Sequence, residues 1–257
     1  MTMQLGPHIA VLTGFAQRHL SGDAEGDKLI NLKLEHSIQV LDTARHIIAG
    51  ETITGRTADI CLLAALYHDT GRFPQFARYQ TFNDRESVNH ARLGVLTLRS
   101  MTLPDGLSGE EWRIVRFAVA QHNAKTVRPT LPARLLHPVM VVRDADKLDI
   151  FRVLLDHFGE NKKNPLVAMG LEDTSVQYSD EVYQAVLQGR TGDYRHMRFA
   201  NDFKLLLAGW LHELHYPTTL AMAVEQRFPD RIFAMLPDDE PLRRLKDSVM
   251  SSIRYKF

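Results

Sequence analysis

Histidine and aspartate residues recur along this chain at positions where they could hold a metal ion. The stretch LYHDTGRF, residues 66–73, places His68 beside Asp69 at the end of an apolar run. Imidazole nitrogen and carboxylate oxygen together suit Zn, Mn, Fe or Co, and they also tolerate Mg. A histidine taken alone is more often a packed or surface residue than a ligand, so only the whole set indicates a metal site. The other candidate ligands are His36, His90, His122 and Asp146.

Each candidate ligand lies in or directly beside a segment with the periodicity of a helix. Residues 57–68 are apolar nearly all round, which is typical of a buried central helix. Residues 108–122 begin with Ser108-x-x-Glu111, the pattern of a capping box. Because facing helices meet at the centre of a bundle, we expect the candidate side chains to converge there. The predicted helices that carry them are residues 34–50, 57–68, 87–100, 108–122 and 137–158.

The rest of the chain also favours an all-α fold. No segment alternates between polar and apolar residues as a half-buried strand does, and helical patterns return in the C-terminal region. Residues 159–178 are polar and irregular, which indicates a mobile loop or a boundary. We therefore expect a single domain over residues 1–257. Its metal-binding core would cover about residues 30–158, and a helical extension about residues 159–257.

The composition is that of an ordinary globular protein. Of 257 residues, 44% are hydrophobic, which is enough for a sizeable core. Lys+Arg and Asp+Glu both number 31, so no basic excess points to a nucleic-acid partner. The single cysteine, Cys61, excludes an internal disulfide and should be a buried thiol. No signal peptide or bilayer-spanning stretch is recognisable, so we expect a cytoplasmic protein without membrane contact.

The order of the candidate ligands resembles a known superfamily. His36, then the pair His68 and Asp69, then Asp146 resembles the H…HD…D signature of the HD-domain superfamily of metal-dependent phosphohydrolases. The wider text HDTGRFPQF…TFNDRESVNHARLG is also similar to stand-alone bacterial HD proteins. The resemblance extends over about residues 30–155. It implies a helical bundle of the HD-domain type with additional C-terminal helices.

Two further histidines, His90 and His122, match the extra pair of the dinuclear branch of that superfamily. This branch includes cyclic-dinucleotide phosphodiesterases, dinucleoside-polyphosphate hydrolases and a few di-iron oxygenases. The resemblance implies two divalent ions bridged by Asp69, since a carboxylate has two oxygens to give. The sequence does not identify the ions as Mn, Fe, Mg, Co or Zn. The implied ligand sets are His36, His68 and Asp146 for one ion, and His90 and His122 for the other.

The resemblance implies an enzyme in which a metal-bridging hydroxide attacks phosphorus. We expect the substrate to be a nucleotide or another small phosphate ester, and a phosphomonoesterase and a phosphodiesterase both stay open. One alternative is a di-iron oxygenase, which would use the same ligands and would be distinguished by metal analysis. The other is a sensor that binds a nucleotide without turnover. The sequence does not indicate an oligomeric state.

Basic residues near the candidate ligands could hold the phosphate. Arg72 follows Asp69 by three residues. Residues 69–86, which include both, show no clear helical or strand period, so we expect them to form an ordered loop. Related dinuclear phosphodiesterases commonly have a lysine in place of Arg72, and we favour a phosphate contact for Arg72 over an ion pair with an acidic neighbour. Asn89 precedes His90 where relatives often have an acid, so the support of that imidazole stays open. The further candidates for substrate binding are Arg143, Lys147 and Lys125.

Overall fold

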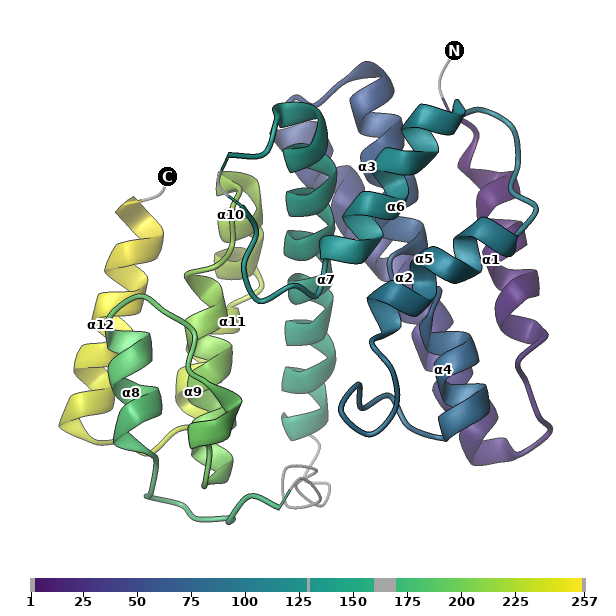
Figure 1. The fold of residues 1–257 in the computed structure, drawn as a ribbon. Helices are drawn as coiled ribbons and strands as arrows, with labels where there is room; N and C mark the ends of the chain where they lie inside the picture. Colours follow the sequence, from purple (N-terminus) through teal and green to yellow (C-terminus); the bar gives the residue numbers. More distant parts are fainter. Residues whose placement is uncertain (1–2, 129, 160–169, 256–257) are drawn as a thin grey trace. The chain divides into compact units, whose positions relative to one another are not determined.

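The structure, a computed structural model, describes residues 3–128, 130–159 and 170–255 and is built from α-helices (Figure 1). Within these ranges β-structure is limited to one isolated bridge between Glu172 and Phe199. The predicted all-α fold class is therefore confirmed. The helices are α1 (Leu5–Gln17), α2 (Ala24–Gly50), α3 (Gly55–Tyr67), α4 (Arg72–Tyr79), α5 (His90–Ser100), α6 (Gly109–Gln121), α7 (Ala133–Gly159), α8 (Asp180–Leu187), α9 (Ala200–Leu211), α10 (Pro217–Glu225), α11 (Phe228–Ala234) and α12 (Glu240–Tyr255).

Helix starts in the N-terminal half are set by local capping. The predicted capping box of α6 is present, because Ser108 and Glu111 each accept from the other's backbone N–H. Helix α5 begins directly after Asn89, whose side chain accepts from Arg92 N. Helix α2 begins much earlier than residue 34, because the Asp23 carboxylate accepts from a backbone N–H of its first turn. The early start extends α2 well ahead of its candidate ligand.

The prediction of a loop over residues 69–86 is wrong for residues 72–79, which form α4. Pro74 lies in the first turn of this helix, where backbone N–H groups lack helical partners anyway, so the proline is tolerated. The helix buries Phe73 and Phe76. It ends at Gln80, whose φ of 54° is left-handed. Tertiary burial of the aromatic residues therefore explains a helix that the sequence pattern did not indicate.

The chain divides into two compact units, Met1–Asp149 and Ile150–Phe257, and their boundary falls inside α7. Half of the irregular segment predicted at residues 159–178 lies outside the described residues. Of its described part, residue 159 is the last residue of α7, and residues 170–178 contain a turn, a bend and the isolated bridge but no helix. The single domain with a C-terminal extension stays a prediction.

In the first unit, α3 is the central helix, as its apolar sequence predicts. It packs against α1, α2 and α6, and α5 packs in turn against α6. Leu63 and Leu66 of α3 are fully buried. Cys61 is also fully buried, and burial raises the pKa of its thiol to about 12. The end of α3, from which the His-Asp pair extends, is thus held in place by its neighbours.

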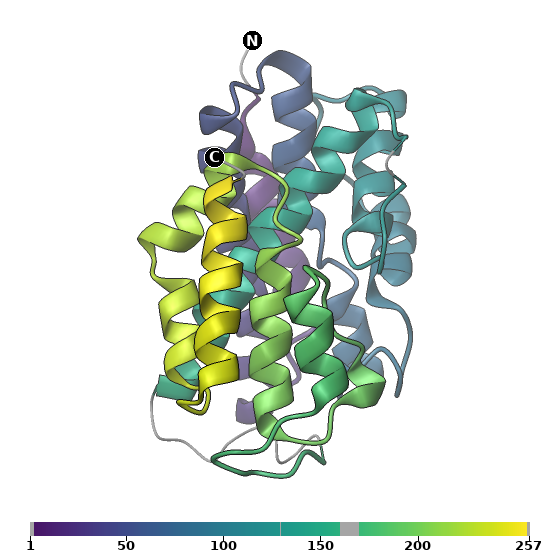
Figure 2. The same cartoon turned by 90° about the vertical axis from the view of Figure 1, so that its left-hand side faces the viewer.

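The second unit is a small bundle around α9, which contacts α8, α11 and α12. Figure 2 shows the yellow α12 running beside the green α8 and α9. Phe151 at the start of this unit packs against Trp210 and Phe228, with ring centroids 6.1 and 5.6 Å apart. These contacts give the second unit a hydrophobic core of its own.

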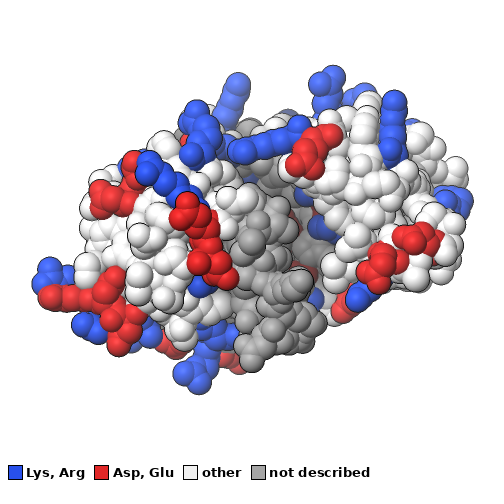
Figure 3. All heavy atoms as spheres, turned by 90° about the horizontal axis from the view of Figure 1, so that it is seen from below, with Lys and Arg blue, Asp and Glu red and all other residues white. Residues whose placement is uncertain are grey.

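Charged side chains of both signs are interspersed over the face that Figure 3 shows. This mixing agrees with the equal numbers of basic and acidic residues in the sequence. Among the described residues, no helix combines the length and the apolar character that crossing a membrane requires.

Candidate metal centre

The six candidate ligands meet within the first unit. His36 lies on α2, His90 is the first residue of α5, and His122 directly follows α6. His68 and Asp69 occupy the turn between α3 and α4. Five of the six are buried, and Asp146 on α7 is half-buried. The helical bundle therefore gathers side chains that are distant in the sequence, as the pattern predicts.

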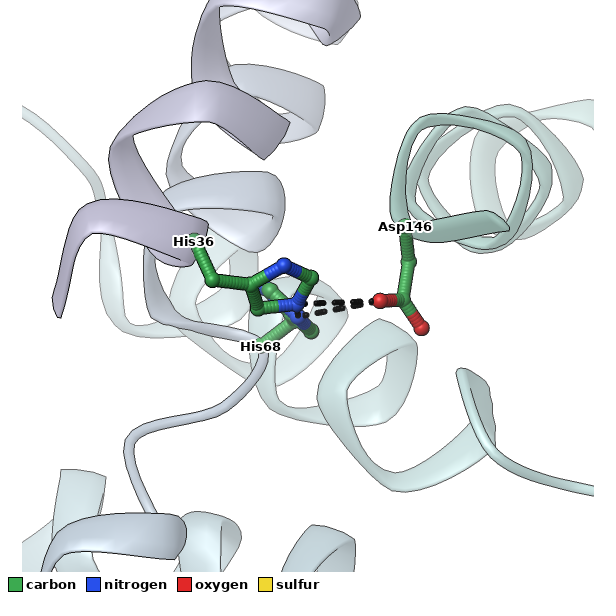
Figure 4. Close-up of side chains that lie close together, drawn as sticks. All are labelled: His36, His68 and Asp146. Carbon is green, nitrogen blue, oxygen red and sulfur yellow. Dashed lines mark hydrogen bonds and ion pairs between the residues drawn. The ribbon is translucent and has the colours of Figure 1, made fainter. Parts of the chain in front are cut away.

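Three donors from three parts of the chain face one point (Figure 4). The Nε2 atom of His36 is 3.2 Å from Nε2 of His68 and 3.1 Å from Oδ1 of Asp146. The distance from Nε2 of His68 to the same carboxylate oxygen is 3.6 Å. Two imidazoles and a carboxylate at this mutual distance could hold one divalent ion.

A second pair of imidazoles lies on the other side of Asp69. Nε2 of His90 and Nε2 of His122 are 3.0 Å apart. These nitrogens lie 3.5 and 3.7 Å from Oδ1 of Asp69. The second group of donors that could hold an ion consists of His68, Asp69 and His122.

The two oxygens of Asp69 face different imidazole pairs. Oδ1 is directed to His90 and His122, whereas Oδ2 lies 3.7 Å from Nε2 of His36 and 3.8 Å from Nε2 of His68. The carboxylate is buried between the two groups. It thus lies where a carboxylate could donate one oxygen to each side.

Every candidate imidazole is oriented through its Nδ1 atom. Nδ1 of His68 donates to the carbonyl oxygen of Ala65 at 2.8 Å, and Nδ1 of His122 donates to that of Val119 at 2.7 Å. A carbonyl oxygen only accepts, so Nδ1 carries the proton and Nε2 keeps a lone pair for the centre. Both histidines directly follow a helix, which places a carbonyl three residues back within reach.

The other two imidazoles are oriented by carboxylates. Nδ1 of His36 is 2.6 Å from Oδ2 of Asp149, and Nδ1 of His90 is 2.8 Å from Oδ2 of Asp84. Such carboxylate partners are typical of metal-binding histidines, because they fix the ring and raise its basicity. The donor set of four directed Nε2 atoms and two carboxylates therefore fits a divalent-metal centre.

Electrostatics keep both central carboxylates ionised. Burial by itself raises the pKa of Asp69, but Lys33, His68 and Arg72 hold it well below its usual range. Burial acts on Asp146 in the same way, and its two histidine contacts likewise lower its pKa well below the usual range. These groups therefore offer negatively charged oxygens at neutral pH.

His36 carries a proton in the absence of metal. Burial and the nearby Lys33 lower the pKa of its imidazole, but the hydrogen bonds to Asp146 and Asp149 outweigh them and raise it to about 9. A metal ion bound at Nε2 would take the place of that proton.

Sequence reasoning missed Asp84, which supports His90. Its carboxylate also accepts from Nη1 of Arg72 at 3.1 Å and from Nε2 of Gln75 at 2.9 Å. The imidazole of His90 is therefore oriented by Asp84, from the loop after α4, and not by the residue that directly precedes it, Asn89. No sequence signal identifies Asp84, because loop residues have no periodicity that relates them to a distant helix.

Sequence reasoning also missed Lys33. Its Nζ atom lies 2.9 Å from Oδ2 of Asp69. A spacing signal existed here, since Lys33 precedes His36 by three residues and so shares its face of α2.

Arg72 is tied to protein groups, which is the alternative that competed with a phosphate contact. Its Nη1 donates to the backbone oxygen of Phe82 at 2.6 Å, to Oδ1 of Asp84 at 3.1 Å and to Gln75 at 3.0 Å. Its Nε lies 3.4 Å from Oδ1 of Asp69. Within the described part of the chain, these contacts leave Nη2 without a hydrogen bond. A phosphate contact through Nη2 stays a prediction.

Arg143 holds the end of α6. Its Nη1 donates to the backbone oxygens of Gln121, His122 and Ala124 at 3.2, 2.8 and 2.7 Å. These bonds fix the segment that carries a candidate ligand. Lys147 is half-buried beside Asp146 and Lys125 is exposed after α6. Substrate contacts by Arg143, Lys147 and Lys125 stay predictions.

Gly71 allows the turn after Asp69 to touch α5. A Cβ atom at this position would lie 2.1 Å from the backbone oxygen of His90 and 2.5 Å from the backbone nitrogen of Gly94. Backbone atoms cannot move aside as a flexible side chain can. Only glycine therefore permits the close approach that brings His90 to Asp69.

Comparison with protein families agrees with this geometry. The family model of the HD domain matches residues 34–150, which include every candidate ligand. HD domains are in general metal-dependent phosphohydrolases. No curated protein and no solved structure gave a match. The dinuclear branch and the likeness to stand-alone bacterial proteins stay predictions. The match over residues 34–150 supports an HD domain in this segment, as the order of the candidate ligands predicts.

Proposed function

We propose that this protein is a phosphohydrolase that acts on a nucleotide or another small phosphate ester and uses two divalent ions. The observation that carries the proposal is the division of the Asp69 carboxylate between two pairs of imidazoles. A mononuclear site would need only one of these pairs. The phosphoester substrate follows from the general activity of HD domains and from the charge of the site.

The ligands divide between two positions. His36, His68 and Asp146 would hold one ion together with Oδ2 of Asp69, and His90 and His122 would hold the other together with Oδ1. Ions held in this way would supply a water of lowered pKa and positive charge for the phosphate oxygens.

The charge of the loaded site favours an anionic substrate. Four neutral imidazoles and two carboxylates offset only half of the positive charge of two divalent ions. A phosphate ester would neutralise the remainder. Asp149 and Asp84 would keep the imidazoles of His36 and His90 in place as the charge of the site changes. Arg72, fixed through Nη1, would direct its Nη2 to a phosphate oxygen.

A metal-reconstitution experiment tests this proposal. Metal-free protein would be loaded separately with Mn, Fe, Mg, Co or Zn and assayed with p-nitrophenyl phosphate, bis-p-nitrophenyl phosphate and nucleotides. We expect turnover that depends on the metal and disappears together with bound metal in Asp69→Ala. Asp42, whose side chain is 44% exposed and pairs with Arg45, provides the control substitution Asp42→Ala.

Two results would contradict the proposal. Full metal content and normal turnover in Asp69→Ala would remove the two-metal interpretation. Two irons in a mixed-valence state, without hydrolysis of any phosphate ester, would instead favour oxygenase chemistry on the same ligands.

A further inference from the structure

The ammonium group of Lys33 lies directly on a candidate metal ligand. Lys33 precedes His36 by one helical turn, and its Nζ lies 2.9 Å from Oδ2 of Asp69. That oxygen is the one directed to His36 and His68. The lysine side chain is 21% exposed, whereas that of Asp69 is only 4% exposed. Lys33 therefore lies between the buried ligands and the solvent.

Two cations flank the carboxylate of Asp69, one at each oxygen. Lys33 contacts Oδ2, and Nε of Arg72 lies 3.4 Å from Oδ1. Both cations also lie over the ring of Phe82, at 5.6 Å for Nζ of Lys33 and 5.9 Å for the guanidinium carbon of Arg72. Phe82 is itself held by Phe76, with ring centroids 4.9 Å apart. The aromatic contact restricts how far Lys33 can move from the site.

The position of Lys33 has opposite consequences for a metal ion and for a phosphate. An ion bound to Oδ2 of Asp69 would lie within a few ångströms of the ammonium, and the two positive charges would repel each other in this partly buried place. A phosphate oxygen between them would convert that repulsion into attraction on both sides. Arg72 differs in this respect, because its contact with Asp84 already offsets its charge.

We propose that Lys33 couples metal binding to phosphate binding. It weakens the binding of the ion at Oδ2 of Asp69 when no phosphate is present, and it binds the phosphate once that ion is in place. Lys33 is thus a phosphate-binding residue and a reason for metal and phosphate to bind together. This inference rests on the proposed function, since it assumes a phosphate-binding metal site.

The coupling is measurable without turnover. Binding of Mn²⁺ to metal-free protein would be titrated with and without inorganic phosphate, for the wild type, Lys33→Met and Lys33→Arg. In the wild type, phosphate should tighten Mn²⁺ binding by about tenfold or more, within the usual range of coupling between two ligands. In Lys33→Met, Mn²⁺ should bind more tightly than in the wild type without phosphate, and phosphate should add little. Lys33→Arg should keep most of the coupling, because the positive charge remains.

Two controls separate this role from a purely structural one. Lys28→Met changes an exposed lysine of the same helix and should match the wild type in both titrations. Lys33→Met should melt at a lower temperature than the wild type when metal-free, since Asp69 loses its counter-ion, and should recover when Mn²⁺ is added. If Lys33→Met does not fold, Lys33→Gln keeps a polar contact to Asp69 and gives the same test.

The failure of this inference differs from the failure of the proposed function. If phosphate tightens Mn²⁺ binding equally in the wild type and in Lys33→Met, the inference is overturned and the metal site for phosphate esters stands. If phosphate leaves Mn²⁺ binding to the wild type unchanged, or if Mn²⁺ does not bind, the inference is overturned. The proposed function is overturned with it only if reconstitution with Fe, Mg, Co and Zn also gives no turnover of a phosphate ester.

Discussion

Replacing Asp84 by asparagine should weaken the binding of one of the two proposed metal ions and leave the binding of the other unchanged. The Asp84 carboxylate lies 2.9 and 2.8 Å from Nδ1 of His90 through its two oxygens. Burial raises its pKa, but the hydrogen bond from His90 leads the effects that lower it to about 2, so it is ionised at neutral pH. Asparagine keeps the size of the side chain but has one acceptor oxygen and no charge.

The expected size of the effect follows from the lost hydrogen bond. A hydrogen bond to a charged group contributes about 1.5–3 kcal/mol, which corresponds to roughly ten- to a hundredfold in affinity. The loss should appear at the ion held by His90 and His122. Metal stoichiometry should therefore fall from two toward one at a concentration that saturates the wild type.

Titration of Mn²⁺ into metal-free variants tests this, with Asp149→Asn as the partner substitution. Asp149 orients the imidazole of His36, so Asp149→Asn should weaken the binding of the other ion. Adding His122→Ala to Asp84→Asn should cost little further binding, whereas adding it to Asp149→Asn should remove both ions. Asp42→Asn, at a half-buried residue of α2 that pairs with Arg45, provides the control. Wild-type affinity for both ions in Asp84→Asn, or equal behaviour of the two combinations, would refute the assignment of each carboxylate to its own ion.

Three further predictions concern the turn, the arginine and the pH dependence. Gly71→Ala should lower the free energy of unfolding by about 1–3 kcal/mol or more and reduce metal content, because the new Cβ would meet the backbone of His90. Chemical denaturation and metal analysis check this prediction, and wild-type values in both measurements would contradict it. Arg72→Ala should lower kcat/KM by roughly ten- to a hundredfold with both ions still bound, and Arg72→Lys should recover part of the loss; a lower melting temperature with unchanged kcat/KM would confine Arg72 to holding the loop. Because the pKa of His36 in the metal-free protein is raised from 6.5 to about 9, its contribution to stability is complete below pH 6.5 and is lost as the pH rises to about 9. That contribution is at most about 3 kcal/mol. The melting temperatures of metal-free wild type and His36→Gln should therefore differ at pH 6.5 and approach each other at pH 9. A difference in melting temperature that stays the same at both pH values would reject this prediction.

Much of the fold was predictable because burial imposes a period on the sequence. The apolar residues of α3 mark a central helix, and Ser108 and Glu111 mark the start of α6, and the structure has both. Helix α4 was not predictable in this way. Its first turn contains Pro74 and follows Gly71, and its stability depends on aromatic residues that pack only in the folded chain.

The candidate site was predictable in its central residues but not in every side chain that supports them. The order from His36 to Asp146 indicated a metal centre, and the structure brings these side chains within a few ångströms of one another. Asp84 was not predictable, because its contact to His90 depends on the path of a loop. The contacts of Arg72 were foreseen only as an alternative, since a single sequence does not show whether a cation faces an acid or a substrate.

The central claim is that Asp69 bridges two metal ions, and anomalous diffraction from crystals grown with Mn²⁺ tests it most directly. The account predicts two manganese peaks about 3.5–4 Å apart, the usual separation in two-metal sites. One peak should lie at Oδ2 of Asp69 beside His36, His68 and Asp146, and the other at Oδ1 beside His90 and His122. A single peak at full occupancy in saturating Mn²⁺, or two peaks that do not share Asp69, would contradict it.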